Sequence, residues 1–258
     1  MIKSKAPEKM QSFQYIVETP VQRSTFSRRS MHGQLATLLG GKIASGALPE
    51  GVILPQEAQM LADLGVSRSV LREALLVLTA KGMLESRQRL GTRVRPREDW
   101  NILDPDVIEW IMENATDDEI LKLFEVRVVL EPAVASIAAT AADPEDVKRI
   151  ESALLDMEDT VESLVDFIPP DLRFHQEIHN ASKNQFLIAL GKLVSDAVLT
   201  LMIVVQVNEQ IRRRNLLLHR RVFEHIRDHN PQEAALAMSE LLEAARLNLQ
   251  AALEARSR

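Results

Sequence analysis

Glycine is almost confined to the first third of this chain, and its distribution limits the folds open to the rest. Of nine glycines, only Gly191 lies beyond Gly91. Because glycine ends helices and permits tight turns, the first third is expected to contain short elements joined by turns. The remainder has few helix breakers, and several of its prolines suit the first turn of a helix. The sequence therefore predicts a mainly α protein, in which a small mixed domain precedes an all-α antiparallel helical bundle.

Three regions are expected along the chain. Residues 1–30 mix charged and small polar residues without a sustained apolar period, which is typical of a flexible arm. Residues 31–97 are predicted to form a winged helix-turn-helix, and residues 98–258 an all-α domain. The elements predicted in the middle region are a helix from Met31 to Gly46, a strand at Val52–Leu54, helices from Pro55 to Gly65 and from Ser67 to Gly82, and a hairpin of residues 83–86 and 92–95.

The last region contains apolar residues at helical spacing with prolines and capping residues between the periodic segments. Asp104 and Asp143 precede prolines and are expected to cap helices, whereas Pro132 is expected to bend a long helix or to split it. The predicted helices are Pro105–Glu113, Asp117–Glu131, Pro132–Ala142, Pro144–Val165, Pro170–Ser182, Gln185–Val207, Glu209–His229 and Pro231–Arg256.

Charge is distributed unevenly between the two halves. Residues 1–97 carry 15 Lys and Arg against 7 Asp and Glu, whereas the rest of the chain carries 16 against 30. A basic region joined to an acidic one suggests a polyanion-binding module attached to a domain with another task. The alternative is that the balance of charge varies along a soluble chain without a functional cause.

Several classes of protein are excluded by composition. The chain contains no cysteine, which rules out disulfides, thiolate zinc sites and iron–sulfur clusters and fits a cytoplasmic protein. The longest apolar stretch is interrupted by Lys192, Ser195 and Asp196, so no segment is long enough to cross a membrane. The lysines near the start are not followed by an apolar segment, and a secretory signal is not expected.

The predicted helix after Ser67 has the features of a DNA recognition helix. Arg68 and Arg72 are four residues apart and project from the face opposite the apolar stripe, where they can contact guanine or phosphate. Ser67 and Ser69 can donate to phosphate oxygens. The alternative is an arginine pair on a solvated helix face. The predicted hairpin favours DNA binding, because it carries the candidate contacts Arg87, Arg89 and Gly91 at its tip, followed by Arg93, Arg95 and Arg97.

A second group of residues has the spacing of metal ligands. Asp171 and His175 are four residues apart on a predicted helix, and His219 lies on another. An aspartate with imidazoles and no thiolate suits Zn²⁺ or a similar divalent ion. His179 continues the same helical stripe. The alternative is that Asp171 and His175 form an ordinary helix-capping or solvent-exposed pair without a metal. The corresponding alternative for Arg127 is an ion pair with Glu131 on the same helix.

A set of motifs with ordered spacing extends over the predicted winged helix: Leu54–Glu57, Leu61–Ala62, Leu64–Arg68, Leu71–Leu75, Gly82–Glu85 and Gly91–Thr92. In these residues the first part of the chain resembles the winged helix of the GntR family of bacterial repressors. The resemblance implies that Arg68 and Arg72 contact operator DNA and that the wing enters the minor groove. The sequence departs from the family at Ala58, where an arginine is usual, and at Arg89, where a glycine is usual.

A second set of motifs lies in the predicted all-α domain: Glu125–Arg127, Leu130–Pro132, Asp171–His175, Asn184, His219 and Ile226. In these residues the second part of the chain resembles the effector domain of the FadR branch, of the FCD type. The segment Trp100–Val107 resembles sugar-acid responders such as the galactonate and hexuronate repressors. The resemblance implies that Asp171, His175 and His219 hold a metal and that Arg127 pairs with a carboxylate effector. A fourth family ligand, a histidine, corresponds to Leu241.

These observations predict a cytoplasmic, homodimeric transcription regulator, a repressor of operator DNA released by a small carboxylate such as an aldonate or hexuronate. Regulators of the same family that respond to an acyl-CoA or an amino acid are an alternative. Two other classes are a metal-dependent hydrolase or lyase, and an architectural DNA-binding protein without an effector. The enzyme is disfavoured because no glycine-rich phosphate loop and no general acid accompany the Asp171 cluster.

Overall fold

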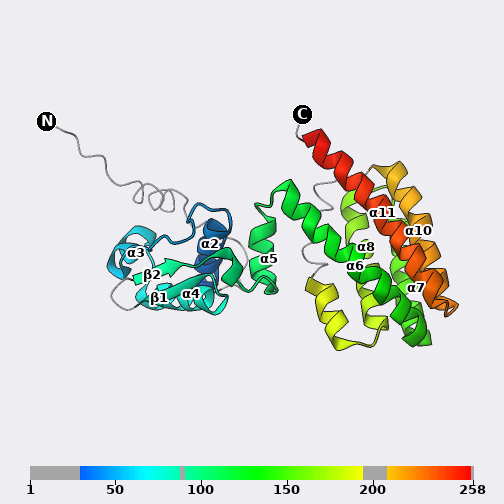
Figure 1. The fold of residues 1–258 in the computed structure, drawn as a ribbon, viewed down its shortest axis with the longest axis horizontal. Coiled ribbons are helices and arrows are strands. Elements are labelled where there is room, and N and C mark those ends of the chain that lie inside the picture. The colour runs from blue at the N-terminus through cyan, green and yellow to red at the C-terminus, as the bar shows by residue number, and fades with distance from the viewer. Residues whose placement is uncertain (1–29, 88–90, 194–207, 257–258) are drawn as a thin grey trace. The chain divides into compact units, whose positions relative to one another are not determined.

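The computed structural model describes residues 30–87, 91–193 and 208–256, and the chain divides into two compact units between Asn114 and Ala115 (Figure 1). Both units are built mainly from helices, which confirms the predicted fold class. The predicted arm, Ser30 apart, and residues 88–90 of the predicted wing tip lie outside the described residues. No helix in the described part of the chain is long and apolar enough to span a membrane.

The first unit contains the winged helix-turn-helix. Its elements are α2 (Met31–Ala44), α3 (Glu57–Leu64), α4 (Arg68–Ala80), β1 (Leu84–Arg87) and β2 (Gly91–Val94). The two strands are antiparallel, with Leu84 opposite Val94 and Arg87 opposite Gly91. The strand predicted at Val52–Leu54 is reduced to a single bridge between Ile53 and Arg93.

Local signals explain where α3 ends and α4 begins. Gly65 closes α3 in the left-handed conformation with φ of 63°, which glycine adopts without strain. Two residues later, the Ser67 side chain accepts a hydrogen bond from the backbone N–H of Val70 and caps α4. Because the connection is so short, the two helices are held close together as a helix-turn-helix.

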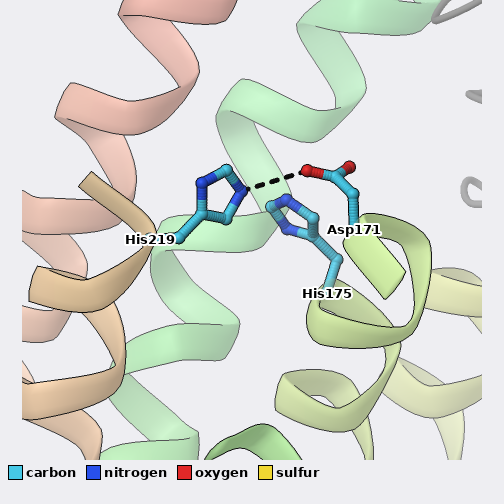
Figure 2. Close-up of side chains that lie close together, drawn as sticks. All are labelled: Asp171, His175 and His219. Carbon is cyan, nitrogen blue, oxygen red and sulfur yellow. Dashed lines mark ion pairs between the residues drawn. The ribbon is translucent and has the colours of Figure 1, made fainter. Parts of the chain in front are cut away.

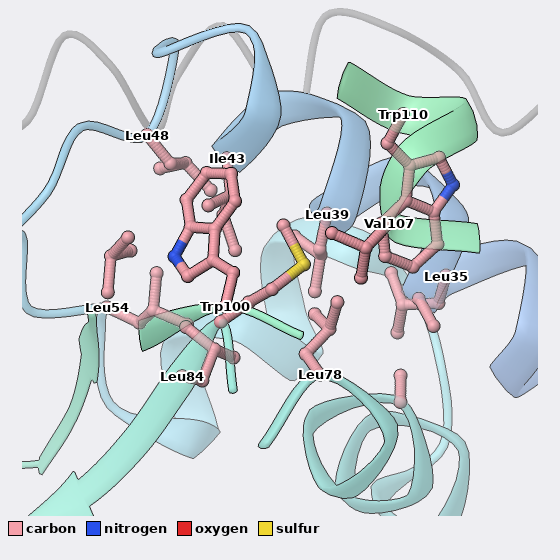
Figure 3. Packing of buried hydrophobic residues seen from close by; sticks show 14 of the residues in the cluster. Leu35, Leu39, Ile43, Leu48, Leu54, Leu78, Leu84, Trp100, Val107 and Trp110 are labelled. Carbon is pink, nitrogen blue, oxygen red and sulfur yellow. The ribbon is translucent and has the colours of Figure 1, made fainter. Parts of the chain in front are cut away.

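Helix α5 (Pro105–Met112) packs into the core of the first unit (Figure 3). Val107 and Trp110 are buried in the same cluster as the leucines of α2. Trp110 lies directly against Gly40, where an added Cβ would come within 2.4 Å of the indole ring. Lys81, at the end of α4, contacts Asp104 at 2.5 Å and Asp106 at 2.8 Å. This packing places the division between the units after α5, whereas the sequence placed a boundary between residues 97 and 98.

The second unit is a helical bundle. Its elements are α6 (Asp117–Ala141), α7 (Pro144–Asp159), α8 (Leu164–Ala181), α10 (Glu209–Arg227) and α11 (Pro231–Arg256), with residues 185–193 also helical. Helix α6 contacts α8, α10 and α11, and α7 contacts α8 and α10. Predicted caps are present at Asp104 before α5 and at Asp143 before α7.

Three helix boundaries in this unit differ from the prediction because prolines lie inside helices. Pro132 does not split α6, and Pro170 does not begin α8, which starts at Leu164 and includes Pro169. Helix α7 correspondingly ends at Asp159 and not at Val165. A proline leaves the carbonyl four residues earlier without a helical donor. The residues that carry those carbonyls are exposed, so water can supply the missing donor. They are Val128, Val165 and Asp166.

Candidate functional site

Asp171, His175 and His219 come together inside the helical bundle (Figure 2). Asp171 and His175 project from α8 and His219 from α10, and all three are buried. One ligand atom from each residue lies within 4.8 Å of the corresponding atoms of the other two. Burial of three such polar side chains is costly unless their polar atoms find partners.

The contact between His219 and Asp171 requires a positive charge between the two side chains. Nδ1 of His219 donates a hydrogen bond to the backbone carbonyl of Asn215 at 2.8 Å, so the neutral ring presents a lone pair at Nε2. That atom lies 3.2 Å from Oδ1 of Asp171. Because two lone pairs repel at this distance, either a proton or a metal ion must lie between them.

The separation between His219 and Asp171 suits two ligands of one divalent ion. Two ligands, each about 2.1 Å from a tetrahedral zinc, lie roughly 3.4 Å apart. The His219–Asp171 separation of 3.2 Å is close to this value. The backbone contact that fixes the His219 tautomer is of the kind that orients imidazole ligands in metal sites. The residues present therefore fit a metal.

The charge of Asp171 is favoured by its neighbours. Burial alone would raise the pKa of its carboxyl, but contact with His219 and the nearby charges of His175 and Arg127 lower the pKa below its ordinary value. The carboxylate is therefore available as an anionic ligand.

A buried chain of charges connects α6 to this cluster. Nε of Arg127 lies 2.5 Å from Oε1 of Glu131, and the other carboxylate oxygen lies 2.6 Å from Nδ1 of His175. Nη2 of Arg127 lies 3.4 Å from Nε2 of His175. Burial opposes the ionisation of both charged groups, but their mutual attraction lowers the pKa of Glu131 and raises that of Arg127.

The sequence indicates Glu131 only as a helical neighbour of Arg127. Its contact with His175 could not be read from the spacing, because α6 and α8 are far apart along the chain. The structure therefore contains both the Arg127–Glu131 pair and a direct contact between Arg127 and the candidate ligand His175.

His179 is separate from the candidate metal cluster, although it continues the helical stripe of Asp171 and His175. Its Nδ1 atom donates to the carbonyl of Leu187 at 2.9 Å. Gly191 packs against the ring, where an added Cβ would come within 2.3 Å of Cγ. Burial lowers the pKa of His179, which favours the neutral ring. This histidine fastens residues 185–193 onto α8.

The candidate DNA-contacting residues of α4 lie at its start and are exposed. Ser67, Arg68, Ser69 and Arg72 are all on the solvent side of the first turns, whereas Leu71 is buried. Arg68 is partly engaged, with Nε 2.9 Å from Oε1 of Glu57 on α3. The Ser67 hydroxyl is committed to capping the helix and contacts Ser69 at 3.0 Å.

The wing is described on both sides of its tip. Nε of Arg87 lies 3.1 Å from Oε1 of Glu85, and Nε of Arg93 donates to the same oxygen at 2.7 Å. Gly91 has φ of 94°, a conformation that favours glycine and begins the return strand. Arg89 lies outside the described residues.

A winged helix-turn-helix with exposed arginines, joined to a helical domain with a buried polar cluster, defines a DNA-binding regulator with a separate sensing domain. Residues 32–94 match the family model described as bacterial regulatory proteins, gntR family, and residues 122–244 match the FCD domain. The chain belongs to the GntR family and carries an FCD effector domain.

Two curated relatives from Escherichia coli (strain K12) show how far the similarity extends. The chain is 36% identical over 165 residues to the galactonate operon transcriptional repressor, a match that covers 62% of this chain and 72% of the relative. It is 34% identical over 170 residues to the HTH-type transcriptional regulator YieP, covering 65% of this chain and 74% of that one. These relatives are transcription regulators and not enzymes, which confirms the predicted class.

A solved structure supports the fold alone. The Listeria monocytogenes protein Lar, described as controlling expression of the agr system, aligns with a TM-score of 0.62 and 17% identity. The alignment covers 86% of this chain and 98% of that one. The likeness between the two proteins is therefore one of fold.

Proposed function

We propose that this protein is a repressor whose helical domain binds a small sugar acid, an aldonate or a hexuronate, and then releases operator DNA. The observation that carries the proposal is the buried cluster of Asp171, His175 and His219 with Arg127 beside it. A relative that acts on a galactonate operon supports a sugar acid as the effector class. Such a protein acts where the chromosome is, so we place it in the cytoplasm.

Asp171, His175 and His219 would hold a divalent ion such as Zn²⁺, which would supply a positive charge that attracts a carboxylate. Leu241 is apolar and buried, so the fourth ligand position of the family has no donor here. Positions left open on the ion would be filled by water or by oxygens of the effector.

Charge balance explains why the ion would be needed for an anionic effector. The charges of Arg127 and Glu131 cancel, and a proton between His219 and Asp171 would leave the metal-free cluster without net charge. Such a cluster would attract a carboxylate only weakly. A divalent ion in place of the proton would make the cluster positive, and Arg127 could still donate to the effector through the nitrogens that Glu131 does not engage.

A further observation favours a hydroxylated acid over an acyl group. Oδ1 of Asn215 lies one helical turn from His219 and is buried without a hydrogen-bond partner in the described residues. A buried carbonyl oxygen is stabilised by a donor such as a hydroxyl group. Sugar acids supply several hydroxyls beside their carboxylate.

We also propose that the protein acts as a homodimer. Helix α6 carries an apolar stripe on the side away from the bundle, formed by Val126, Val129 and Ile137, all of them exposed. A winged helix needs a second copy to occupy the two half-sites of an operator. Covering the stripe with the same stripe of a second copy would remove apolar surface from water and set the spacing of the two recognition helices.

The proposal is tested by operator release. A fluorescent operator fragment bound by zinc-loaded protein is titrated with aldonates, hexuronates, amino acids and an acyl-CoA, after a thermal-shift screen for binding. Release by a sugar acid in the wild type, and its loss in His175→Ala, would support the proposal. Release only by an amino acid or acyl-CoA, or equal release from His175→Ala, would contradict it.

A further inference from the structure

We propose that Glu131 is a positioning residue for the metal site, because its carboxylate orients the His175 ring so that Nε2 is available to the ion. This inference rests on the proposed metal site and adds a residue to it. Arg127 contributes to this arrangement as well, because it pairs with the Glu131 carboxylate on the same helix and holds it in place.

The contact between Glu131 and His175 determines which nitrogen carries the proton. Nδ1 of His175 lies 2.6 Å from Oε2 of Glu131, and both side chains are buried. Neither atom makes a hydrogen bond of good geometry with the other or with any further described residue, but a ring nitrogen and a carboxylate oxygen this close need a proton between them. Because a carboxylate oxygen only accepts, the shared proton belongs to Nδ1, and the lone pair of the neutral ring is at Nε2.

Arg127 supports the same tautomer from the other side of the ring. Its Nη2 atom lies 3.4 Å from Nε2 of His175, and a guanidinium can donate there but cannot accept. Its Nε atom is 2.5 Å from Oε1 of Glu131, so one arginine contacts both the orienting carboxylate and the oriented ring. With Nδ1 protonated, Nε2 carries the lone pair of the ring, and an ion bound there would replace its contact with Arg127.

The two histidine ligands are therefore oriented by different means. The His219 ring is fixed by the carbonyl of Asn215 on its own helix, which any helix can provide. The His175 ring is fixed by a carboxylate from α6. A carboxylate acceptor also makes the imidazole a stronger ligand, and removing such a group typically weakens metal binding about 10- to 100-fold.

The experiment measures the zinc affinity of full-length protein by competition with a chromophoric chelator. Glu131→Gln is expected to weaken zinc binding by about 10- to 100-fold. The matched control is Glu177→Gln. Glu177 lies on α8, the helix that carries two of the proposed ligands, and its carboxylate pairs with Arg149 of α7. The control should bind zinc like the wild type.

Two further measurements separate positioning from loss of structure. The variant Arg127→Met with Glu131→Gln removes both buried charges together, so it leaves no unpaired charge in the core, and it should also lose zinc affinity. Nitrogen-15 NMR of the metal-free wild type should show the Nδ1-protonated tautomer of His175, and Glu131→Gln should show a mixture of tautomers.

The outcomes distinguish this inference from the proposed function. Wild-type zinc affinity in Glu131→Gln, or an Nε2-protonated His175 in the wild type, would overturn the role of Glu131 and leave the metal site intact. A wild type that binds no zinc would overturn the metal site and the inference together. Equal losses in Glu131→Gln and Glu177→Gln would reduce the effect to general destabilisation.

Discussion

Two adjacent glycines of α2 provide a controlled test of how α5 is fixed to the DNA-binding unit. An added Cβ at Gly40 would meet two ring carbons of Trp110 at 2.4 Å, whereas nothing lies within 4 Å of one at Gly41. Both residues lie inside the same helix, so Gly40→Ala and Gly41→Ala gain the same helical preference, about 0.5–1 kcal/mol.

The difference between the two variants isolates the steric cost. Ordinary van der Waals contact begins near 3.4 Å, so the indole of Trp110 must move away from Gly40→Ala by roughly 1 Å. Overpacking a well-packed core costs about 1–3 kcal/mol. Gly40→Ala should therefore be less stable than Gly41→Ala by about 1–3 kcal/mol, while Gly41→Ala should be slightly more stable than the wild type.

Tryptophan fluorescence during urea unfolding measures this difference in stability for the first unit, which contains both glycines. The chain has two tryptophans, Trp100 and Trp110, and both are buried in the core of the first unit. Their signal therefore follows the DNA-binding unit and not the helical bundle. Equal midpoints for Gly40→Ala and Gly41→Ala would refute the packing of α5 against α2.

The remaining predictions concern the two binding sites. Arg72→Ala should weaken specific operator binding by about 1–3 kcal/mol in fluorescence anisotropy at fixed salt, and unchanged affinity would remove α4 from the interface. Arg89→Ala should reduce the slope of log K against log salt by about 0.9, as expected for one lost phosphate contact; an unchanged slope would place Arg89 off the DNA. Leu241→His should tighten zinc binding in a chelator competition by adding a ligand, and unchanged or weaker binding would show that this position does not reach the ion.

The order of elements was readable from the sequence because their signals are local. Ser67 and Gly65 define the turn between α3 and α4 through capping and a left-handed conformation, both of which depend on neighbouring residues. The prolines of α8 misled the prediction because the residues whose carbonyls lose a helical donor are exposed to solvent, and exposure is not visible in the sequence.

The candidate site was predictable only in part. Asp171 and His175 share a helix, so their spacing places them on one face, and the structure brings His219 to them as expected. The contact between Glu131 and His175 joins two helices and depends on how the bundle packs. The packing of Trp110 against Gly40 is equally non-local, and it extends the first unit to the end of α5.

The central claim is that Asp171, His175 and His219 bind a divalent ion on which a sugar acid depends. The most direct measurement is elemental analysis of protein purified without chelator, combined with calorimetry of the best sugar acid before and after chelation. The purified protein is expected to contain a divalent ion, and its affinity for the sugar acid should fall on chelation and return when the ion is restored. Metal-free protein that binds the sugar acid with undiminished affinity would contradict it.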